Sequence, residues 1–319
     1  MNPLSATYGA LTYARNLLYD SGLLSARLQG PVISVGSISA GGAGKTPFVM
    51  LLGELLKQRG IGVDVLSRGY GRESKGVHVV DADGRARDFG DEPLLIAQHL
   101  SVPVVVGENR YQAGLLAEQT FGPQLHLLDD GFQHRALARD FDIVLLTEAD
   151  THDTLLPVGR LREPLASLGR ADAVALVNSA ALPRVQLKRG ARVWRIRRRT
   201  CITKAAARPV VFCGIARPAD FFLEVRRLGI DAAAELAFRD HHAYGAQDIE
   251  RLITVACDNA ANGFVTTEKD CINLGAHAAA LVPLTYAKVQ MELEAAEEAV
   301  AAILACASVP ARLAAREKI

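Results

Sequence analysis

Short apolar runs, many of them β-branched, alternate with longer stretches of helical spacing between residues 32 and 177. Apolar runs bounded by turn residues predict buried strands, and apolar positions three or four residues apart predict helices. The predicted strands are residues 32–35, 63–66, 102–106, 125–128, 143–146 and 173–177. The predicted helices between them are residues 47–59, 93–100 and 110–120. This alternation predicts an α/β fold whose mostly parallel sheet is flanked by helices.

The pattern departs from this rhythm at several places. Residues 77–80, followed by a turn at 81–84, predict a hairpin arm inserted among the strand–helix units. The basic run at residues 195–199 predicts a solvated strand between domains in preference to a contact with anionic lipid. A smaller-scale alternation from about residue 200 predicts a second, smaller α/β domain. Its predicted elements are residues 210–213, 219–228, 246–260, 263–266 and 281–284, followed by a helix at 289–307 that packs on either domain.

The first 30 residues form a separate feature, because apolar side chains recur there at helical spacing with arginines interspersed. The apolar residues are Leu4, Tyr8, Leu11, Leu17, Leu18, Leu23 and Leu24. An amphipathic helix of this kind lies on a membrane surface or packs on its own domain, and the pattern alone favours packing. We expect no spanning helix, because no apolar run of about 18 residues occurs. We also expect no signal peptide, because the start lacks a basic region.

Composition and charge are those of an ordinary globular protein. The 319 residues suggest two domains or one large one, and half of them are hydrophobic. A net charge of +1 gives no reason to expect nucleic-acid binding. The five cysteines are widely spaced without a CxxC pair, which predicts reduced thiols in the core of a cytosolic protein.

The glycine-rich loop SVGSISAGGAGKTP, residues 34–47, joins the first predicted strand to the first predicted helix. Backbone N–H groups and the helix dipole converge on an anion at such a junction. Gly41, Gly42 and Gly44 permit the close backbone approach that a phosphate cradle requires. Lys45 would reach the β- and γ-phosphates of a nucleotide, and Thr46 would ligate Mg²⁺. The loop therefore predicts a nucleotide site.

Two acidic pairs lie at the ends of predicted elements. Asp129 and Asp130 end an apolar strand, as in a Walker B segment, at the edge where α/β sheets bind ligands. The alternative for this pair is an ordinary turn. Asp91 and Glu92 precede a helix that Pro93 could open. They are either capping residues, which the spacing alone favours, or a general base and a magnesium ligand near the γ-phosphate.

Single arginines and histidines lie where these loops would converge. Arg110 and Arg162 could stabilise the transferred charge or hold a substrate phosphate. His134 follows Asp129 and Asp130 within one turn. His241 and His242 are adjacent and so do not share a face, which argues against a two-histidine metal site. One of them as an acid or base partner is the more plausible interpretation.

Taken together and in order, these motifs resemble the tetraacyldisaccharide 4′-kinase family, the lipid A 4′-kinases of Gram-negative bacteria. The segments that carry the resemblance are PVISVGSISAGGAGKTP, SRGYGR, GDEP, ENR, LLDDGFQH, PVGRLREPL, FCGIARP, FRDHHAY and VTTEKD. Ser39, where the strict P-loop pattern has glycine, matches the family's loop. The resemblance runs from the first helix to about residue 270. It implies transfer of the γ-phosphate of ATP to the 4′-hydroxyl of a tetraacylated glucosamine disaccharide 1-phosphate, which gives lipid IVA.

The resemblance also implies roles for individual residues. Asp91 would be the general base and would pair with His241 from the second domain. Lys45, Arg110 and Arg162 would complete the catalytic group. ATP would be bound by Ser39, Ala40, Gly41, Gly42, Ala43, Gly44, Lys45 and Thr46. Mg²⁺ would be associated with Thr46, Glu92, Asp129 and Asp130.

Finally, the resemblance implies an organisation. Residues 1–30 would be an amphipathic membrane-associating helix, residues 31–199 a P-loop kinase core domain, and residues 200–319 a smaller α/β domain across a cleft. A lipid substrate gives the apolar helix face a use, so the preference shifts to peripheral attachment on the cytoplasmic face of the inner membrane. We expect no nucleic-acid partner and no obligate protein partner. The alternatives are a regulatory or chaperone-type NTPase and a soluble nucleotide or sugar kinase.

Overall fold

The computed structural model describes residues 3–20, 25–178 and 180–306. Its strands form a 12-stranded sheet in the order β10-β9-β11-β12-β8-β7-β6-β1-β5-β2-β4-β3. The strands are β1 (Val32–Ser37), β2 (Val63–Ser67), β3 (His78–Val79), β4 (Val104–Val106), β5 (Leu125–Asp129), β6 (Phe141–Leu146), β7 (Ala173–Val177), β8 (Arg192–Cys201), β9 (Val210–Cys213), β10 (Ala234–Ala237), β11 (Phe264–Thr267) and β12 (Leu284–Leu293).

Helices cover this sheet, and their lengths follow the predicted apolar spacing closely in the first half of the chain. The α-helices are α1 (Pro3–Asp20), α2 (Lys45–Lys57), α3 (Ala86–Phe89), α4 (Asp91–Leu100), α5 (Arg110–Phe121), α6 (Glu148–His152), α7 (Pro218–Arg227), α8 (Ala246–Asp258), α9 (Glu268–Leu274) and α10 (Ala296–Cys306). Two short 3₁₀-helices are η1 (Leu165–Arg170) and η2 (Gly275–Ala280). The predicted fold class, a mostly parallel sheet flanked by helices, is confirmed.

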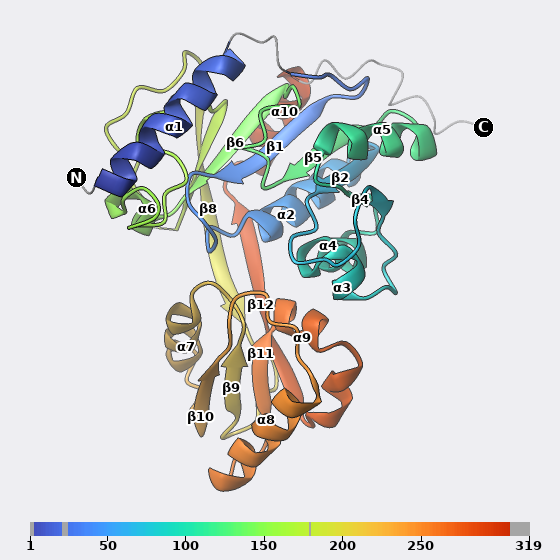
Figure 1. The fold of residues 1–319 in the computed structure, drawn as a ribbon, viewed down its shortest axis with the longest axis vertical. Coiled ribbons are helices and arrows are strands. Elements are labelled where there is room, and N and C mark those ends of the chain that lie inside the picture. Colours follow the sequence, from blue (N-terminus) through green and yellow to red (C-terminus); the bar gives the residue numbers. More distant parts are fainter. Residues whose placement is uncertain (1–2, 21–24, 179, 307–319) are drawn as a thin grey trace.

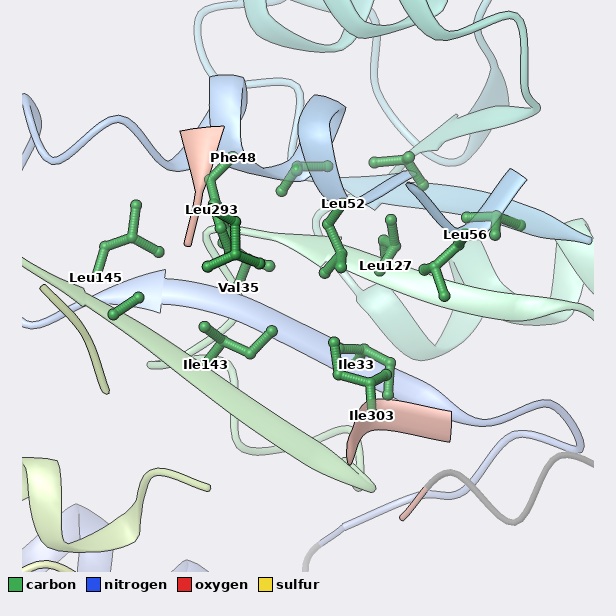
Figure 2. Packing of buried hydrophobic residues seen from close by; sticks show 14 of the residues in the cluster. Ile33, Val35, Phe48, Leu52, Leu56, Leu127, Ile143, Leu145, Leu293 and Ile303 are labelled. Carbon is green, nitrogen blue, oxygen red and sulfur yellow. The ribbon is translucent and has the colours of Figure 1, made fainter. Parts of the chain in front are cut away.

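The first part of the sheet contains six parallel strands, β7, β6, β1, β5, β2 and β4, each buried along its whole length. Strands that are apolar on both faces require helices on both faces. One face carries α2, α4 and α10, whose side chains share one core cluster. Figure 2 shows Leu52 and Leu56 of α2 and Ile303 of α10 in this cluster with Ile33 and Leu127 of the sheet. The other face is covered by α5.

The second part of the sheet is smaller. Strands β9, β10 and β11 are parallel to one another, and β11 is parallel to β12. Helix α8 packs on one face through Ile249 and Leu252, and α7 packs on the other through Phe221 and Val225. The parallel strands of both parts therefore carry helices on two faces, as the alternating pattern of apolar runs requires.

The two parts are joined by the long antiparallel pair of β8 and β12. Strand β8 is also parallel to β7, and β12 is parallel to β11, so the hydrogen-bonded sheet is continuous. Figure 1 shows this pair running between the upper and lower blocks, and α10 returning to the upper block. The predicted domain boundary at residues 199 and 200 falls within β8.

Some sequence predictions were wrong. Residues 77–80 contain β3, but its antiparallel partner is β4, and α3 and α4 intervene, so the two strands do not form a hairpin. The helix predicted at 289–307 begins only at Ala296, because Val289 to Leu293 belong to β12. The cysteines are not all core residues, since Cys257 and Cys306 are exposed.

Helix α1 packs with its polar side inward. Ser5, Thr12 and Asn16 are buried, whereas Leu11 and Leu17 are 68% and 51% exposed. Helix α1 therefore packs on its own domain, as the pattern alone favoured, but it does so through polar side chains and leaves its apolar face exposed. Leu23 and Leu24 lie outside the described residues. No helix in the described part of the chain is long and apolar enough to cross a membrane.

Candidate active site

A cleft of about 1380 Å³ opens between the two parts of the sheet. Its walls include the glycine-rich loop after β1, the ends of β2 and β5, and residues that follow β9, β10 and β11. Ligands of parallel α/β sheets bind beyond the carboxyl ends of the strands. The cleft also reaches α1, because Tyr8 and Arg15 contribute to its wall.

The glycine-rich loop has the conformation of a phosphate cradle. Gly41, Gly42 and Gly44 have φ angles of 66°, 80° and 83°, which favour glycine. Gly44 is the residue that precedes α2, so the N-terminus of α2 faces the cleft. A Cβ atom on Gly44 would lie 2.2 Å from Cε of Met291, the flexible end of a β12 side chain, which would have to move. The backbone N–H groups of this loop can therefore approach an anion closely.

Most of the predicted nucleotide-binding residues line the cleft. These are Ala40, Gly41, Gly42, Gly44, Lys45 and Thr46. Ser39 and Ala43 belong to the same loop, but they are buried and do not line the cleft. The structure also shows Arg160, whose Nη2 donates to the carbonyl of Ala40 at 2.6 Å. The sequence analysis did not single out Arg160, although it lies in the PVGRLREPL segment.

The predicted Walker B pair lies directly opposite Lys45. Asp130 Oδ1 is 3.4 Å from Nζ of Lys45, and Asp130 Oδ2 is 2.7 Å from Nη1 of Arg162. Burial alone would raise the pKa of Asp130, but these two cations outweigh it and hold that pKa below its ordinary value. The turn interpretation also holds, since Asp130 forms a turn at the end of β5 with a φ angle of 54°. Asp130 therefore lies in a turn and also contacts Lys45 of the glycine-rich loop.

Asp129 is a buried carboxylate that lacks a close cationic partner within the part of the chain that the structure describes. It is buried, and its Oδ1 accepts no hydrogen bond from the described residues. Burial, followed by the charges of Glu92 and Asp130, raises its pKa to about 7. Arg110 is buried nearby, donates to the carbonyl of Gly107 at 2.9 Å, and has its pKa lowered by burial to about 10. A cation held at Asp129 would relieve this arrangement.

Thr46, Asp129, Asp130 and Glu92 all line the cleft, as expected for a magnesium site. The described residues contain no group of three or more His, Cys, Asp or Glu side chains arranged to enclose a metal ion. Mg²⁺ in kinase sites is commonly held by one or two carboxylates together with substrate phosphates and water. The oxygen donors here fit such a site, because Oδ1 of Asp129 and Oδ1 of Asp130 are buried without a hydrogen-bond partner among the described residues.

The structure brings Asp91 and His241 together across 150 positions of sequence. His241 Nδ1 lies 2.9 Å from Asp91 Oδ2, and Asn273 Nδ2 donates to the same oxygen at 3.0 Å. Asp91 Oδ1 accepts the N–H of Glu92 at 2.8 Å. Asp91 therefore stabilises the first turn of α4 and also faces the second part of the molecule. The geometry is compatible both with a role at the start of the helix and with a role as a general base.

Electrostatics keep the Asp91 carboxyl ionised. Burial by itself would raise its pKa, but the hydrogen bond from His241 and the charge of Lys269 outweigh burial and lower it. Burial likewise would lower the pKa of His241, yet the hydrogen bond and charge of Asp91 raise it. The sequence analysis missed Lys269 and Asn273. Lys269 lies in the VTTEKD segment, whereas nothing in the sequence marks Asn273.

The two remaining histidines have different surroundings. His134 lines the cleft, and burial, followed by Arg110 and Arg139, lowers its pKa to about 4. His242 turns away from the cleft, because its Nε2 pairs with Asp248 at 3.0 Å. Of the adjacent pair, only His241 is therefore placed to act in the cleft.

A glycine-rich loop at a helix N-terminus, a carboxylate pair near its lysine and a histidine–aspartate pair at the edge of the same cleft define the chain as a P-loop phosphotransferase. Comparison with known proteins identifies the family within this class. The sequence profile of the LpxK family, described as tetraacyldisaccharide-1-P 4′-kinase, matches residues 1–307. The chain belongs to this family. The function predicted from the sequence, 4′-phosphorylation of tetraacyldisaccharide 1-phosphate with ATP, is that of the family, and the chain is a kinase with a hydroxyl acceptor.

Individual relatives agree with this assignment. The tetraacyldisaccharide 4′-kinase of Koribacter versatilis is 49% identical over 315 residues, which cover 95% of this chain and 98% of that protein. The tetraacyldisaccharide 4′-kinase of Aquifex aeolicus is 38% identical over 290 residues, covering 85% and 88%. A crystal structure of "apo" form LpxK from Aquifex aeolicus in complex with ATP superimposes with a TM-score of 0.76 at 34% identity, covering 96% and 98%.

Proposed function

We propose that the cleft is where the γ-phosphate of ATP passes to the 4′-hydroxyl of tetraacyldisaccharide 1-phosphate, with Asp91 as the general base. The observation that carries this assignment is the contact of 2.9 Å between His241, which lines the cleft, and Asp91, which is buried directly behind it. An ionised carboxylate held by donors on its neighbouring atoms can accept the proton of an attacking hydroxyl. His241 holds the Asp91 carboxylate in place and donates from Nδ1.

The loop residues 39–46 bind ATP through their backbone N–H groups at the start of α2. Lys45 supplies a charge to the β- and γ-phosphates. This requires Lys45 to exchange its contact of 3.4 Å with Asp130 for the phosphates. Arg110 and Arg162 line the same cleft and supply further positive charge for the transferred group.

Mg²⁺ completes the site, with Thr46 and Asp129 as protein ligands and Glu92 and Asp130 close to them. Support comes from the unpaired Oδ1 of buried Asp129. When bound, the ion neutralises charge on the β- and γ-phosphates. Positioning of the two reactants by the chain's own residues supplies most of the remaining catalysis.

We also propose that residues 31–199 and 200–319 act as two domains, apart from α10, which packs with the first core. Asp91 belongs to the first and His241 to the second. The joining pair β8 and β12 is the connection about which the cleft would open and close around the substrate. Closure would assemble the aspartate–histidine pair and exclude water from it.

Helix α1 is proposed to lie on the cytoplasmic face of the inner membrane as a peripheral anchor. Its outward side chains Leu11, Tyr13 and Leu17 are more than half exposed. Its inward side reaches the cleft through Tyr8 and Arg15. A lipid substrate whose acyl chains remain in the membrane would then present its sugar headgroup to the cleft.

One assay tests the proposal. The pure protein is incubated with γ-labelled ATP, Mg²⁺ and tetraacyldisaccharide 1-phosphate in detergent micelles, and the lipid fraction is examined for label. Transfer at the 4′ position, absent in an Asp91→Asn variant that still binds ATP, is the expected result. Intact ATP binding without any labelled lipid would contradict the proposal.

A further inference from the structure

Two side chains of the second part of the molecule reach the same end of α4. His241 Nδ1 lies 2.9 Å from Oδ2 of Asp91, and Lys269 Nζ lies 3.1 Å from Oε1 of Glu92. These two side chains also contact each other, since Lys269 Nζ is 3.3 Å from Nε2 of His241. Because Asp91 and Glu92 are neighbours, the four residues form a closed ring of contacts.

The chemistry of these contacts determines where the imidazole carries its proton. A lysine ammonium has three donors and no acceptor, so its contact with Nε2 requires a lone pair on Nε2. The proton of the neutral ring then lies on Nδ1, where the ionised carboxylate of Asp91 accepts it. Lys269 and Asp91 thus select the same tautomer from opposite sides of the ring.

A second carboxylate, that of Asp240, lies near Nε2 of His241 and could accept a proton from it. Oδ1 of Asp240 lies 3.9 Å from Nε2 of His241. Without the ammonium, this carboxylate could accept a proton from Nε2, and the lone pair of Nδ1 would then face Asp91. Two acceptors facing each other repel, so the ring and the carboxylate would separate. On the remaining side, the Tyr70 ring packs at 4.9 Å from the imidazole and offers no opposing charge.

Lys269 and His241 are held by one network. Asp270, beside Lys269, accepts the N–H of Gly214 at 2.7 Å and the hydroxyl of Tyr244 at 2.9 Å. The carbonyl of Gly214 in turn accepts the N–H of His241 at 3.0 Å. His241 has a φ angle of 55°, a conformation that non-glycine residues adopt only when their surroundings hold them there. The spacing between Lys269 and His241 is therefore built into this part of the fold.

We propose that Lys269 is a positioning residue of the phosphoryl-transfer site, which keeps the proton of His241 on Nδ1 and ties that imidazole to the helix of Asp91. The inference rests on the proposed function, because it assumes that the aspartate–histidine pair serves the reaction. Lys269 does not touch the reacting hydroxyl. It acts by holding the base in the geometry that faces the substrate.

The test compares Lys269→Met with Lys288→Met and Lys269→Arg. Lys288 is a suitable control because its Nζ lies 3.8 Å from Glu268, at the start of α9 and outside the ring of contacts. Lys269→Met should lower kcat about 10- to 100-fold, as expected for a misplaced catalytic group. KM for ATP should change less than about threefold, because the phosphate cradle is untouched. Lys269→Arg keeps a donor and should restore most of the rate, and Lys288→Met should not alter it.

A spectroscopic measurement separates positioning from a general structural effect. In protein labelled with ¹⁵N-histidine, the signals of His241 are identified by their loss in His241→Gln. At a pH well above the raised pKa of His241, where the ring is neutral, wild-type protein should show a protonated Nδ1 and an unprotonated Nε2. Lys269→Met should show the proton moved to Nε2 or shared between both nitrogens, while its thermal unfolding stays close to that of Lys288→Met.

The inference is overturned if Lys269→Met retains the wild-type tautomer, if it retains the wild-type kcat, or if Lys269→Arg is as slow as Lys269→Met. A different result would contradict the proposed function. Normal turnover of both Asp91→Asn and His241→Gln would remove the base assignment, whatever the tautomer of His241.

Discussion

Asn16 of α1 donates a hydrogen bond from Nδ2 to Oε2 of Glu163 at 2.8 Å, which joins the outermost helix to the residue next to Arg162. Glu163 is fully buried and also accepts from Arg170 at 2.8 Å and from Gln133 at 3.1 Å. Burial alone would raise the pKa of Glu163, but these donors outweigh burial and lower it. A buried polar contact therefore holds α1 while its apolar face stays outside.

The first prediction concerns this contact. Asn16→Ala removes one donor from a buried carboxylate, which typically costs about 1–3 kcal/mol. The amides of α1 should then exchange with solvent hydrogen faster by about 5- to 150-fold, the equivalent of that cost. Thr7→Ala is the control, because the exposed Thr7 hydroxyl donates to the carbonyl of Pro3 in the same helix. Equal exchange rates in both variants would show that the contact does not hold the helix.

The second prediction concerns the aspartate–histidine pair. Asp91→Asn and His241→Gln should each lower kcat about 10²- to 10⁴-fold, because each removes part of the proposed base. Calorimetric titration should show unchanged ATP affinity, since neither side chain lies on the glycine-rich loop. His242→Gln is a matched control, because its imidazole pairs with Asp248 away from the cleft. A His242→Gln variant as slow as His241→Gln would argue against the assignment.

The third prediction concerns Mg²⁺. Chelation should abolish phosphoryl transfer, and Asp129→Asn should raise the Mg²⁺ concentration for half-maximal rate by about 10-fold or more. Asp140→Asn provides the comparison, because Asp140 accepts the N–H of Val32 at the opposite end of β1. Titrating Mg²⁺ against initial rate measures both. An unchanged requirement in Asp129→Asn would remove Asp129 from the ligand set.

The fourth prediction concerns the exposed face of α1. Burying a leucine side chain contributes about 1.5–3 kcal/mol, so Leu11→Ser and Leu17→Ser should each weaken vesicle binding about 10-fold or more. Cosedimentation with phospholipid vesicles measures this. Leu223→Ser removes a leucine of α7 with 44% exposure and should not alter binding. Equal losses from all three variants would point to nonspecific adsorption.

The fifth prediction concerns a buried triad at the far end of the sheet from the cleft. His126 Nδ1 lies 2.8 Å from Asp64, and its Nε2 lies 3.3 Å from Glu118. Burial alone would lower the pKa of His126, but the two carboxyl groups outweigh burial and raise it above 6.5. A raised histidine pKa stabilises the fold below the unfolded pKa and loses that contribution as pH rises through the folded one.

The free energy of unfolding should therefore fall as the pH rises above 6.5, by up to about 1.4 kcal/mol per unit in its steepest region. In His126→Gln this part of the slope should be absent, although the variant should be less stable overall. Urea unfolding at a series of pH values measures the difference. Parallel curves for the two proteins would show that His126 does not titrate in this range.

Elements with a strong local signal were predicted well. Residues 173–177 coincide with β7, and the loop before α2 was recognised because glycine and Lys-Thr mark it. The second half of β12 was predicted as helix, although Val289, Met291 and Leu293 alternate with polar residues. Its alanine- and glutamate-rich continuation into α10 masked that alternation. The sequence did not indicate which face of α1 is buried, because the buried contacts of Asn16 are polar and leave no apolar pattern.

The sequence by itself determined the fold class, because apolar periodicity is a local property of the chain, and the resemblance of its motifs in their order determined the family. Only the tertiary structure decided which of these residues meet. The contacts of His241 and Lys269 with the start of α4 depend on β8 and β12 joining the two parts of the sheet. Such contacts arise from packing between segments more than 100 residues apart, and no local pattern encodes their geometry.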